Sequence, residues 1–390
     1  MAAYLISATT KNVIPATRSN RSQWLYLALL VAISMSVITE LGCSNSSTMK
    51  TPNPDAQQVL FLPNGDSTTS AYLINSDGSL TTVVGSPFSV GGFGAATDSG
   101  GKFLFTAGRT SLTTFTVGSS GVPTAASSVN DSTLDGSISI NPAGTALYAD
   151  SIDAAEGNHG WKTYSIQADG SLQFVSGQID QVNGPLVFGS DGSNAYSATC
   201  YHFSPNIEHF TVASSGALSS TLEQVAVIST NPAECPVAVA INPAGDRIAS
   251  AWSDADSSGT VDNAIGLYAI DPNSHALALT SASPFSASGK GRDIKFDPSG
   301  KFVVVAQDSG IGVYQAGQNS VSEISGSPFA SGTDFDRLLF SHAGTFVVAI
   351  SQKSQQVSVF TFNNTTGVLS AAPGSPLSAN AGDNLAILQQ

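Results

Sequence analysis

The sequence predicts an all-β protein, a seven-bladed β-propeller of four-stranded antiparallel blades. The first observation is a turn phrase of the type Asp/Asn-Pro-x-Gly, or a close variant, that recurs along 390 residues at intervals of 43 to 55. Such periods belong to propeller blades or helical arrays. The last glycines of the phrase are Gly101, Gly144, Gly192, Gly245, Gly300 and Gly344.

The second observation is that short runs of Val, Ile, Phe, Tyr and Thr flank each phrase, as in "KFDPSGKFVVVA" from Lys295. Short runs of this kind between turn residues are typical of strands and not of a helical period. Proline after Asn or Asp pre-sets one turn residue, and glycine supplies the positive φ that another requires. The phrase therefore predicts a tight hairpin turn.

The third observation is a second hairpin signal after each first one, for example "IQADGSLQFV" from Ile166. Each unit then has four strands, named a to d in chain order. We expect a strands to begin near Phe93, Ser137, Pro185, Val237, Arg292, Arg337 and Asn384, and b strands near Val59, Phe103, Ala146, Asn194, Arg247, Phe302 and Phe346.

The ends of the chain predict how the ring closes. The first unit lacks its own a strand, and the sequence finishes with an orphan a-like strand, "NLAILQQ" from Asn384. Pairing this C-terminal strand with "QQVLFLPNG" of the first blade would complete seven blades and leave no exposed interior sheet edge.

A Ser-Pro-Phe or Ser-Pro-Leu phrase recurs four times, beginning "GSPF" at Gly85, "ASPF" at Ala282, "GSPF" at Gly326 and "GSPL" at Gly374. We expect it just after strand d, where the chain crosses to the centre of the next blade. Proline ends the strand, because it cannot donate to a ladder, and the apolar residue packs between blades. The phrase is interpreted as a structural staple.

The N-terminal residues predict export. Lys11, Arg18 and Arg21 precede an uncharged apolar run at residues 24–38, long enough for a signal peptide and short for a membrane span. Leu41-Gly42-Cys43 resembles the end of a bacterial lipoprotein box, with Glu40 in place of the usual aliphatic residue. Acylated Cys43 would hold the protein to a membrane at the periplasmic side or cell surface. An uncleaved anchor, or cleavage elsewhere, remains open.

These features give three predicted segments: a signal peptide at 1–42, a flexible tether at 43–56 and a propeller at 57–390. The tether is rich in Ser, Thr, Asn and Pro. The formal net charge of −14 disfavours nucleic acid as a partner. We expect a monomer.

Cys200 and Cys235 are expected to form a disulfide. Cys200 ends a b strand and Cys235 precedes the next a strand, and both positions fall on the face that carries the b–c loops and the d–a crossings. Export permits oxidation. Two independent buried thiols are the alternative.

The order of residues from Gly291 to Ala306, "GRDIKFDPSGKFVVVA", together with seven blades, resembles the bacterial lactonase propellers. That family includes 6-phosphogluconolactonase-like and carboxy-muconate cycloisomerase-like proteins. The resemblance covers about residues 56–390, and it implies a site in the central funnel that uses His, Arg and Glu near the starts of a strands. Arg292 fits a frequent arginine, whereas Asp293 stands where such proteins often have histidine. Catalytic candidates are Arg292, Asp293 and Arg337.

Two long b–c loops are candidate ligand-binding sites, because aromatic rings beside carboxylates and amides can hold a polyol. Ordinary solvated loops are the alternative. The ligand-binding candidates are Glu156, His159, Trp161, His202, Trp252 and Arg109. No cofactor is expected. The spacing of "DADSSGTVD" matches the opening of a calcium loop, with Asp254, Asp256, Ser258 and Asp262 as candidate ligands, although Ile265 stands where the closing Glu is expected. An acidic hairpin loop without metal is the favoured alternative.

Two classes of function are left. One is an exported hydrolase that acts on a lactone or sugar-acid ester at the funnel. Carboxylates or water would then serve as general acid and general base. The other is a non-catalytic scaffold that binds carbohydrate or protein with its loop face, since a fold does not by itself fix an activity.

Overall fold

The computed structural model describes residues 57–390 apart from 66–67, 153–158, 180–183, 200–204, 220–222, 225–227, 229–233, 255–262, 381 and 383. The side chains of residues 178, 179, 223, 224 and 254 are likewise not described. The predicted signal peptide, the lipidated Cys43 and the tether lie outside the described residues. Within the described ranges, no helix is long and apolar enough to cross a membrane.

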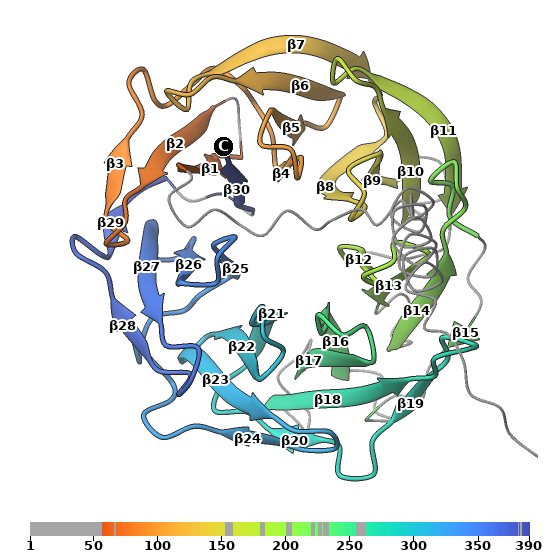
Figure 1. The fold of residues 1–390 in the computed structure, drawn as a ribbon, viewed down its shortest axis with the longest axis vertical. Helices are drawn as coiled ribbons and strands as arrows, with labels where there is room; N and C mark the ends of the chain where they lie inside the picture. Colours follow the sequence, from red (N-terminus) through yellow and green to blue (C-terminus); the bar gives the residue numbers. More distant parts are fainter. Residues whose placement is uncertain are drawn as a thin grey trace, which may run out of the picture. The chain divides into compact units, whose positions relative to one another are not determined.

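Seven antiparallel sheets surround a central axis, which confirms the seven-bladed propeller (Figure 1). From the axis outward, six of them run β4–β7, β8–β11, β12–β15, β16–β19, β21–β24 and β25–β28, and the seventh runs β30-β1-β2-β3. The short strands β20 and β29 pair with β18 and β27.

The innermost strands are β30 (Ala386–Gln389), β4 (Gly94–Thr97), β8 (Leu134–Ile140), β12 (Val187–Phe188), β16 (Glu234–Ile241), β21 (Gly291–Phe296) and β25 (Arg337–Phe340). The second strands are β1 (Gln58–Pro63), β5 (Phe103–Ala107), β9 (Ala146–Ile152), β13 (Asn194–Thr199), β17 (Arg247–Asp254), β22 (Phe302–Gln307) and β26 (Phe346–Ser351).

The third strands are β2 (Thr69–Ile74), β6 (Ser111–Val117), β10 (His159–Ile166), β14 (Asn206–Thr211), β18 (Asn263–Ile270), β23 (Gly310–Ala316) and β27 (Gln356–Phe362). The outer strands are β3 (Leu80–Thr82), β7 (Pro123–Asn130), β11 (Leu172–Ile179), β15 (Glu223–Gln224), β19 (Leu277–Leu279), β20 (Phe285–Ser286), β24 (Val321–Glu323), β28 (Leu369–Ala371) and β29 (Leu377–Ser378).

The recurring turn phrase forms the hairpin between the first two strands of a blade. In the β21–β22 hairpin, the buried Asp297 carboxylate accepts hydrogen bonds from the backbone N–H groups of Ser299 and Phe302, at 3.0 and 2.7 Å. Gly300 follows with φ +70°, a conformation that favours glycine. Asp or Asn at the first position therefore fixes the turn through its side chain.

The C-terminal strand closes the ring as predicted. β30 pairs antiparallel with β1, with Gln58 opposite Gln389 and Phe61 opposite Ala386. Its side chains alternate between the two neighbouring blade interfaces. Ile387 packs with the β25–β27 blade, and Leu388 packs with the β4–β6 blade.

The Ser-Pro phrase follows the outer strand and packs between blades as expected, but the chain does not cross to the next blade there. The residues after proline do not yet cross to the next blade: β20 and β29 return to the third strand of their own blade, and Phe88 and Phe329 form single bridges of the same kind. The outer strand is therefore interrupted and resumed, and the crossing comes later. Phe88, Phe285, Phe329 and Leu377 pack against the apolar clusters between blades.

Candidate active site

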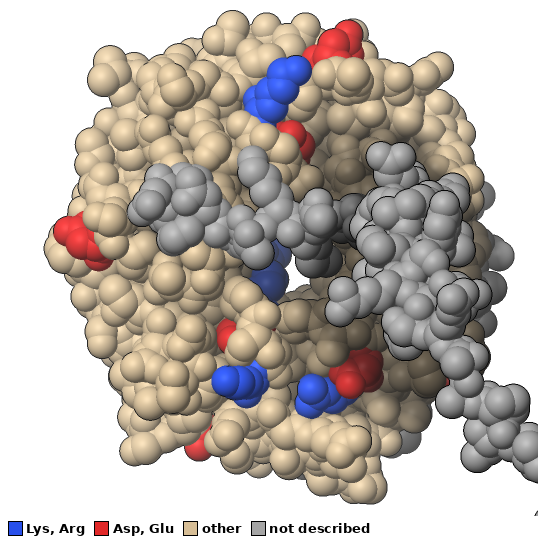
Figure 2. Space-filling view, viewed as in Figure 1, with Lys and Arg blue, Asp and Glu red and all other residues tan. Residues whose placement is uncertain are grey.

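A cavity of about 490 Å³ lies at the hub of the ring. All seven innermost strands, or the residues just before them, contribute to its wall. Figure 2 shows an opening at the hub on a face with few charged residues. Most of the wall is apolar, and its polar side chains are Thr97, Asp135, Ser137, Ser139, Asp293, Lys295, Arg337, His342 and Asn384.

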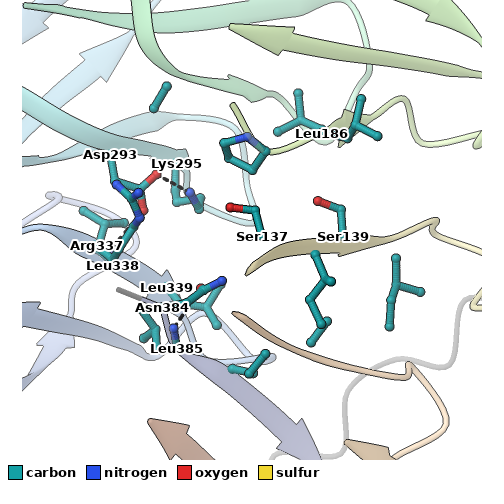
Figure 3. Close-up of a pocket in the computed structure, with 18 of the residues that line it drawn as sticks. Ser137, Ser139, Leu186, Asp293, Lys295, Arg337, Leu338, Leu339, Asn384 and Leu385 are labelled. Carbon is teal, nitrogen blue, oxygen red and sulfur yellow. Dashed lines mark hydrogen bonds and ion pairs between the residues drawn. The ribbon is translucent and has the colours of Figure 1, made fainter. Parts of the chain in front are cut away.

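Three charged side chains gather on one wall of the cavity, where β21 lies beside β25 (Figure 3). The Asp293 carboxylate accepts a hydrogen bond from Lys295 Nζ at 2.5 Å and one from the backbone N–H of Leu338 at 3.0 Å. A register shift between Gly291 and Asp293 precedes this contact, and such bulges redirect side chains. Asp293 thus joins the inner strands of two blades.

Arg337 begins β25 and adds a positive charge beside this pair. One guanidinium nitrogen, Nη1, donates to the backbone carbonyls of Arg292 and Asp336 at 3.3 and 3.2 Å. Among the described residues no carboxylate lies within ion-pair distance of Arg337. Guanidinium has five N–H donors. Arg337 therefore keeps donors and a charge that a ligand oxygen in the cavity can use.

Arg292, the neighbouring catalytic candidate, is directed elsewhere. Its Nε and Nη2 donate to the two carboxylate oxygens of Asp334 at 2.8 and 2.9 Å. Asp336 lies 3.9 Å from the same guanidinium, and Arg292 does not line the cavity. A bidentate ion pair of this kind occupies the guanidinium fork. The catalytic role of Arg292 stays a prediction; its guanidinium is held in this ion pair and is not part of the cavity wall.

The cavity also contains residues that the sequence did not single out, Lys295 and His342. His342 lies in the β25–β26 turn and lines the cavity. Its Nε2 donates to the backbone carbonyl of Ile387 at 3.0 Å. Arg337 begins β25, whereas His342 lies in the turn that follows the strand.

The two tryptophans proposed to stack on a ligand are buried. Trp161 lies within β10 and Trp252 within β17, each with 1% of its surface exposed. Neither ring is accessible for stacking, so this prediction is corrected: both rings fill the interior. The sequence did not distinguish them from loop residues, because each adjoins a long polar stretch.

The remaining ligand-binding candidates are dispersed. His159 begins β10, near Asp135 and Asp150. Arg109 is exposed and covers the ring of Phe93, with its guanidinium carbon 5.0 Å from the ring centroid. Glu156 and His202 lie outside the described residues.

Most of the predicted calcium ligands and one of the two paired cysteines lie outside the described residues. Asp256, Ser258 and Asp262 lie outside the described residues, as does the side chain of Asp254. Cys235 is disulfide-bonded. Cys200 falls in an undescribed range, so its pairing with Cys235 stays a prediction.

A family model described as a seven-bladed β-propeller lactonase matches residues 16–322. The chain belongs to this lactonase family. No match was found among curated proteins.

Solved structures share the fold of this lactonase-family chain at low identity. A candidate 6-phosphogluconolactonase from Bacteroides uniformis has a TM-score of 0.68 at 14% identity, covering 85% of this chain and 99% of that one. A periplasmic gluconolactonase from Pseudomonas aeruginosa has a TM-score of 0.66 at 15% identity, with 85% and 99% covered.

Proposed function

We propose that this protein is an exported lactone hydrolase that binds a sugar-acid lactone in the hub cavity. The proposal rests on Arg337, a cation in the cavity wall beside the Asp293–Lys295 pair. Its guanidinium keeps N–H donors that a ligand can use. Membership of the lactonase family supports the same activity. The periplasmic gluconolactonase that shares the fold provides a precedent for such an activity outside the cytoplasm.

Lactone hydrolysis needs a donor for the carbonyl oxygen and a site for water. Water adds to the carbonyl carbon, the ring C–O bond breaks, and the open hydroxy acid releases a proton. Arg337 would bind the carbonyl oxygen as negative charge develops on it, and later the product carboxylate. Asp293 accepts from Ile294 N–H, Lys295 and Leu338 N–H. A carboxylate has about four acceptor positions, so one is left for the attacking water.

The test is hydrolysis of a panel of sugar-acid lactones by the purified full-length protein. Arg337→Ala is expected to lower kcat/KM at least 100-fold, in the range seen when one oxyanion donor is removed. Lys353→Ala is the matched control, because Lys353 is an exposed cation in the β26–β27 turn of the same blade, away from the cavity. Hydrolysis that is unaffected by Arg337→Ala would contradict the proposed site. Binding of lactone or carbohydrate without turnover would favour the non-catalytic alternative.

The location outside the cytoplasm rests on the basic leader, its apolar run and Cys43. We propose a lipid anchor on Cys43 at the periplasmic side or cell surface. Cys43→Ser should move the protein from the membrane fraction to the soluble fraction, because the chain would then lack its acyl chains. Equal membrane retention of both forms would contradict the anchor.

A further inference from the structure

Three metal-ligating side chains meet at the edge of the hub cavity, in the blade of β8–β11. Asp135 lies in β8, Asp150 in β9, and His159 begins β10. One ligand atom from each lies within 4.8 Å of the others. We propose that these residues form a divalent transition-metal site, with Zn²⁺ as its best-fitting ion. The proposal is independent of lactone hydrolysis.

The strand pairing explains how three residues far apart in the chain converge. Asp150 lies opposite Trp161 in the β9–β10 ladder, and His159 is two residues before Trp161. Side chains two residues apart share a face of a sheet, so Asp150 and His159 are diagonal neighbours. The β8–β9 register shifts between Leu134 and Ile138, which places Asp135 within a bulge. Bulges of this kind re-aim side chains near functional sites.

The distances fit a small cation better than they fit hydrogen bonds. His159 Nδ1 is 3.6 Å from Asp135 Oδ2 and 3.7 Å from Asp150 Oδ1. Both separations exceed the range of a good N–H···O bond. Ligands about 2.1 Å from zinc in tetrahedral geometry are about 3.4 Å apart. Both histidine-to-carboxylate distances are therefore close to those between two ligands of one ion.

The polar atoms at the centre of the cluster lack partners. Asp150 is 5% exposed, and among the described residues neither its Oδ1 nor His159 Nδ1 has a hydrogen-bond partner. Buried polar atoms without partners are rare, and an ion is one of the explanations that such a group calls for. Two unpartnered atoms that face each other across the cluster thus point to a ligand between them.

The charge of the cluster is also uncompensated. Two carboxylates and one imidazole converge here, and among the described residues no Lys or Arg lies within ion-pair distance of either carboxylate. A bound cation would supply the positive charge that buried carboxylates require. One imidazole and two carboxylates suit Zn²⁺ and its first-row neighbours better than calcium or magnesium, which prefer oxygen ligands alone.

The ion would lie where water or a small ligand can reach it from the hub cavity. Asp135 also lines the hub cavity, and its side chain is 42% exposed. Three protein ligands leave at least one position open on a four-coordinate ion, as in catalytic zinc sites. A ligand oxygen or water that enters the cavity beside Asp135 could complete the coordination.

The test is calorimetric titration of Zn²⁺ into the full-length protein after chelator treatment, with excess Ca²⁺ present to occupy any calcium loop. One Zn²⁺ per chain and a rise in thermal midpoint are expected. Asp135→Asn and His159→Gln should each weaken binding at least tenfold. Asp135 is the safer substitution for folding because its side chain is more exposed than that of His159. His275→Gln, which removes a histidine in the β18–β19 turn, should leave binding unchanged.

A second readout reports the coordination itself. Co²⁺ in place of Zn²⁺ should give visible absorption bands that weaken in Asp135→Asn and His159→Gln and persist in His275→Gln. The absence of stoichiometric Zn²⁺ binding would overturn the proposal, as would equal affinity in all variants.

Discussion

The carboxylate of Asp131 accepts four hydrogen bonds. Asp131 connects the β7–β8 crossing to β10. It accepts from Lys162 Nζ at 2.6 Å and Tyr164 Oη at 2.8 Å, and from the backbone and hydroxyl of Thr133. Partial burial opposes ionisation, but these four hydrogen bonds outweigh it and hold the pKa of Asp131 at about 2, below the usual 3.8.

This depressed pKa makes Asp131 a source of stability at neutral pH. The contribution is present above pH 4, the unfolded value, and is lost as the pH falls toward 2. Asp131→Asn should lower the free energy of unfolding at pH 7 by about 2 kcal/mol. The difference should shrink toward zero near pH 2, which urea denaturation across this range can measure. Asp77→Asn, in an exposed turn, is the control and should change stability far less.

At the scale of an element, the serine of the Ser-Pro phrase has a specific role. In each of the four copies its hydroxyl oxygen accepts a hydrogen bond from a backbone N–H of the third strand, at 2.7 to 3.0 Å. The hydroxyl thus replaces the carbonyl that an unbroken outer strand would offer. In two of the blades without the phrase, β7 and β11 run for 8 residues each and contain a bulge instead.

Removing one of these hydroxyls should leave a backbone donor unpaired. Ser375 Oγ accepts from the N–H of Val359, a residue that is 1% exposed. Ser375→Ala should therefore cost about 1–3 kcal/mol of unfolding free energy and speed hydrogen exchange at Val359. Ser378→Ala, an exposed serine in β29, is the matched control. Unchanged exchange at Val359 in the Ser375 variant would show that another acceptor replaces the hydroxyl.

The elements were predictable from the sequence because their signals are local. Six of the seven second strands begin at the predicted residue, and β1 begins one residue before Val59. Turn phrases and apolar runs decide these positions within a few residues. The cavity was less predictable, since its wall joins seven distant segments. Asp293 and Arg337 could be predicted because they lie near the starts of innermost strands. Placing Lys295 and His342 in the cavity requires knowing which way their strand and turn face.

At the scale of the whole molecule, β30 provides the link between the two ends of the propeller. It pairs with β1, and Ile387 O accepts hydrogen bonds from Thr97 Oγ1 at 2.9 Å and from His342 Nε2 at 3.0 Å. Thr97 and His342 belong to the two blades on either side. One short strand therefore connects three blades, and its loss would open both of the interfaces that it fills.

Deletion of residues 384–390 should destabilise the ring as a whole. Leu385, Ile387 and Leu388 are all buried, and removing them from the core should cost roughly 4.5–9 kcal/mol at the usual 1.5–3 kcal/mol for each large apolar side chain. The deletion also exposes the inner edge of β1, which is then free to pair with another chain. We expect a lower thermal midpoint, loss of a single cooperative transition and concentration-dependent aggregation, measured by calorimetry and light scattering. Gln390→Ala keeps β30 intact and should retain one transition close to that of the unaltered protein. An unchanged midpoint after the deletion would mean that the blades hold the ring closed without β30.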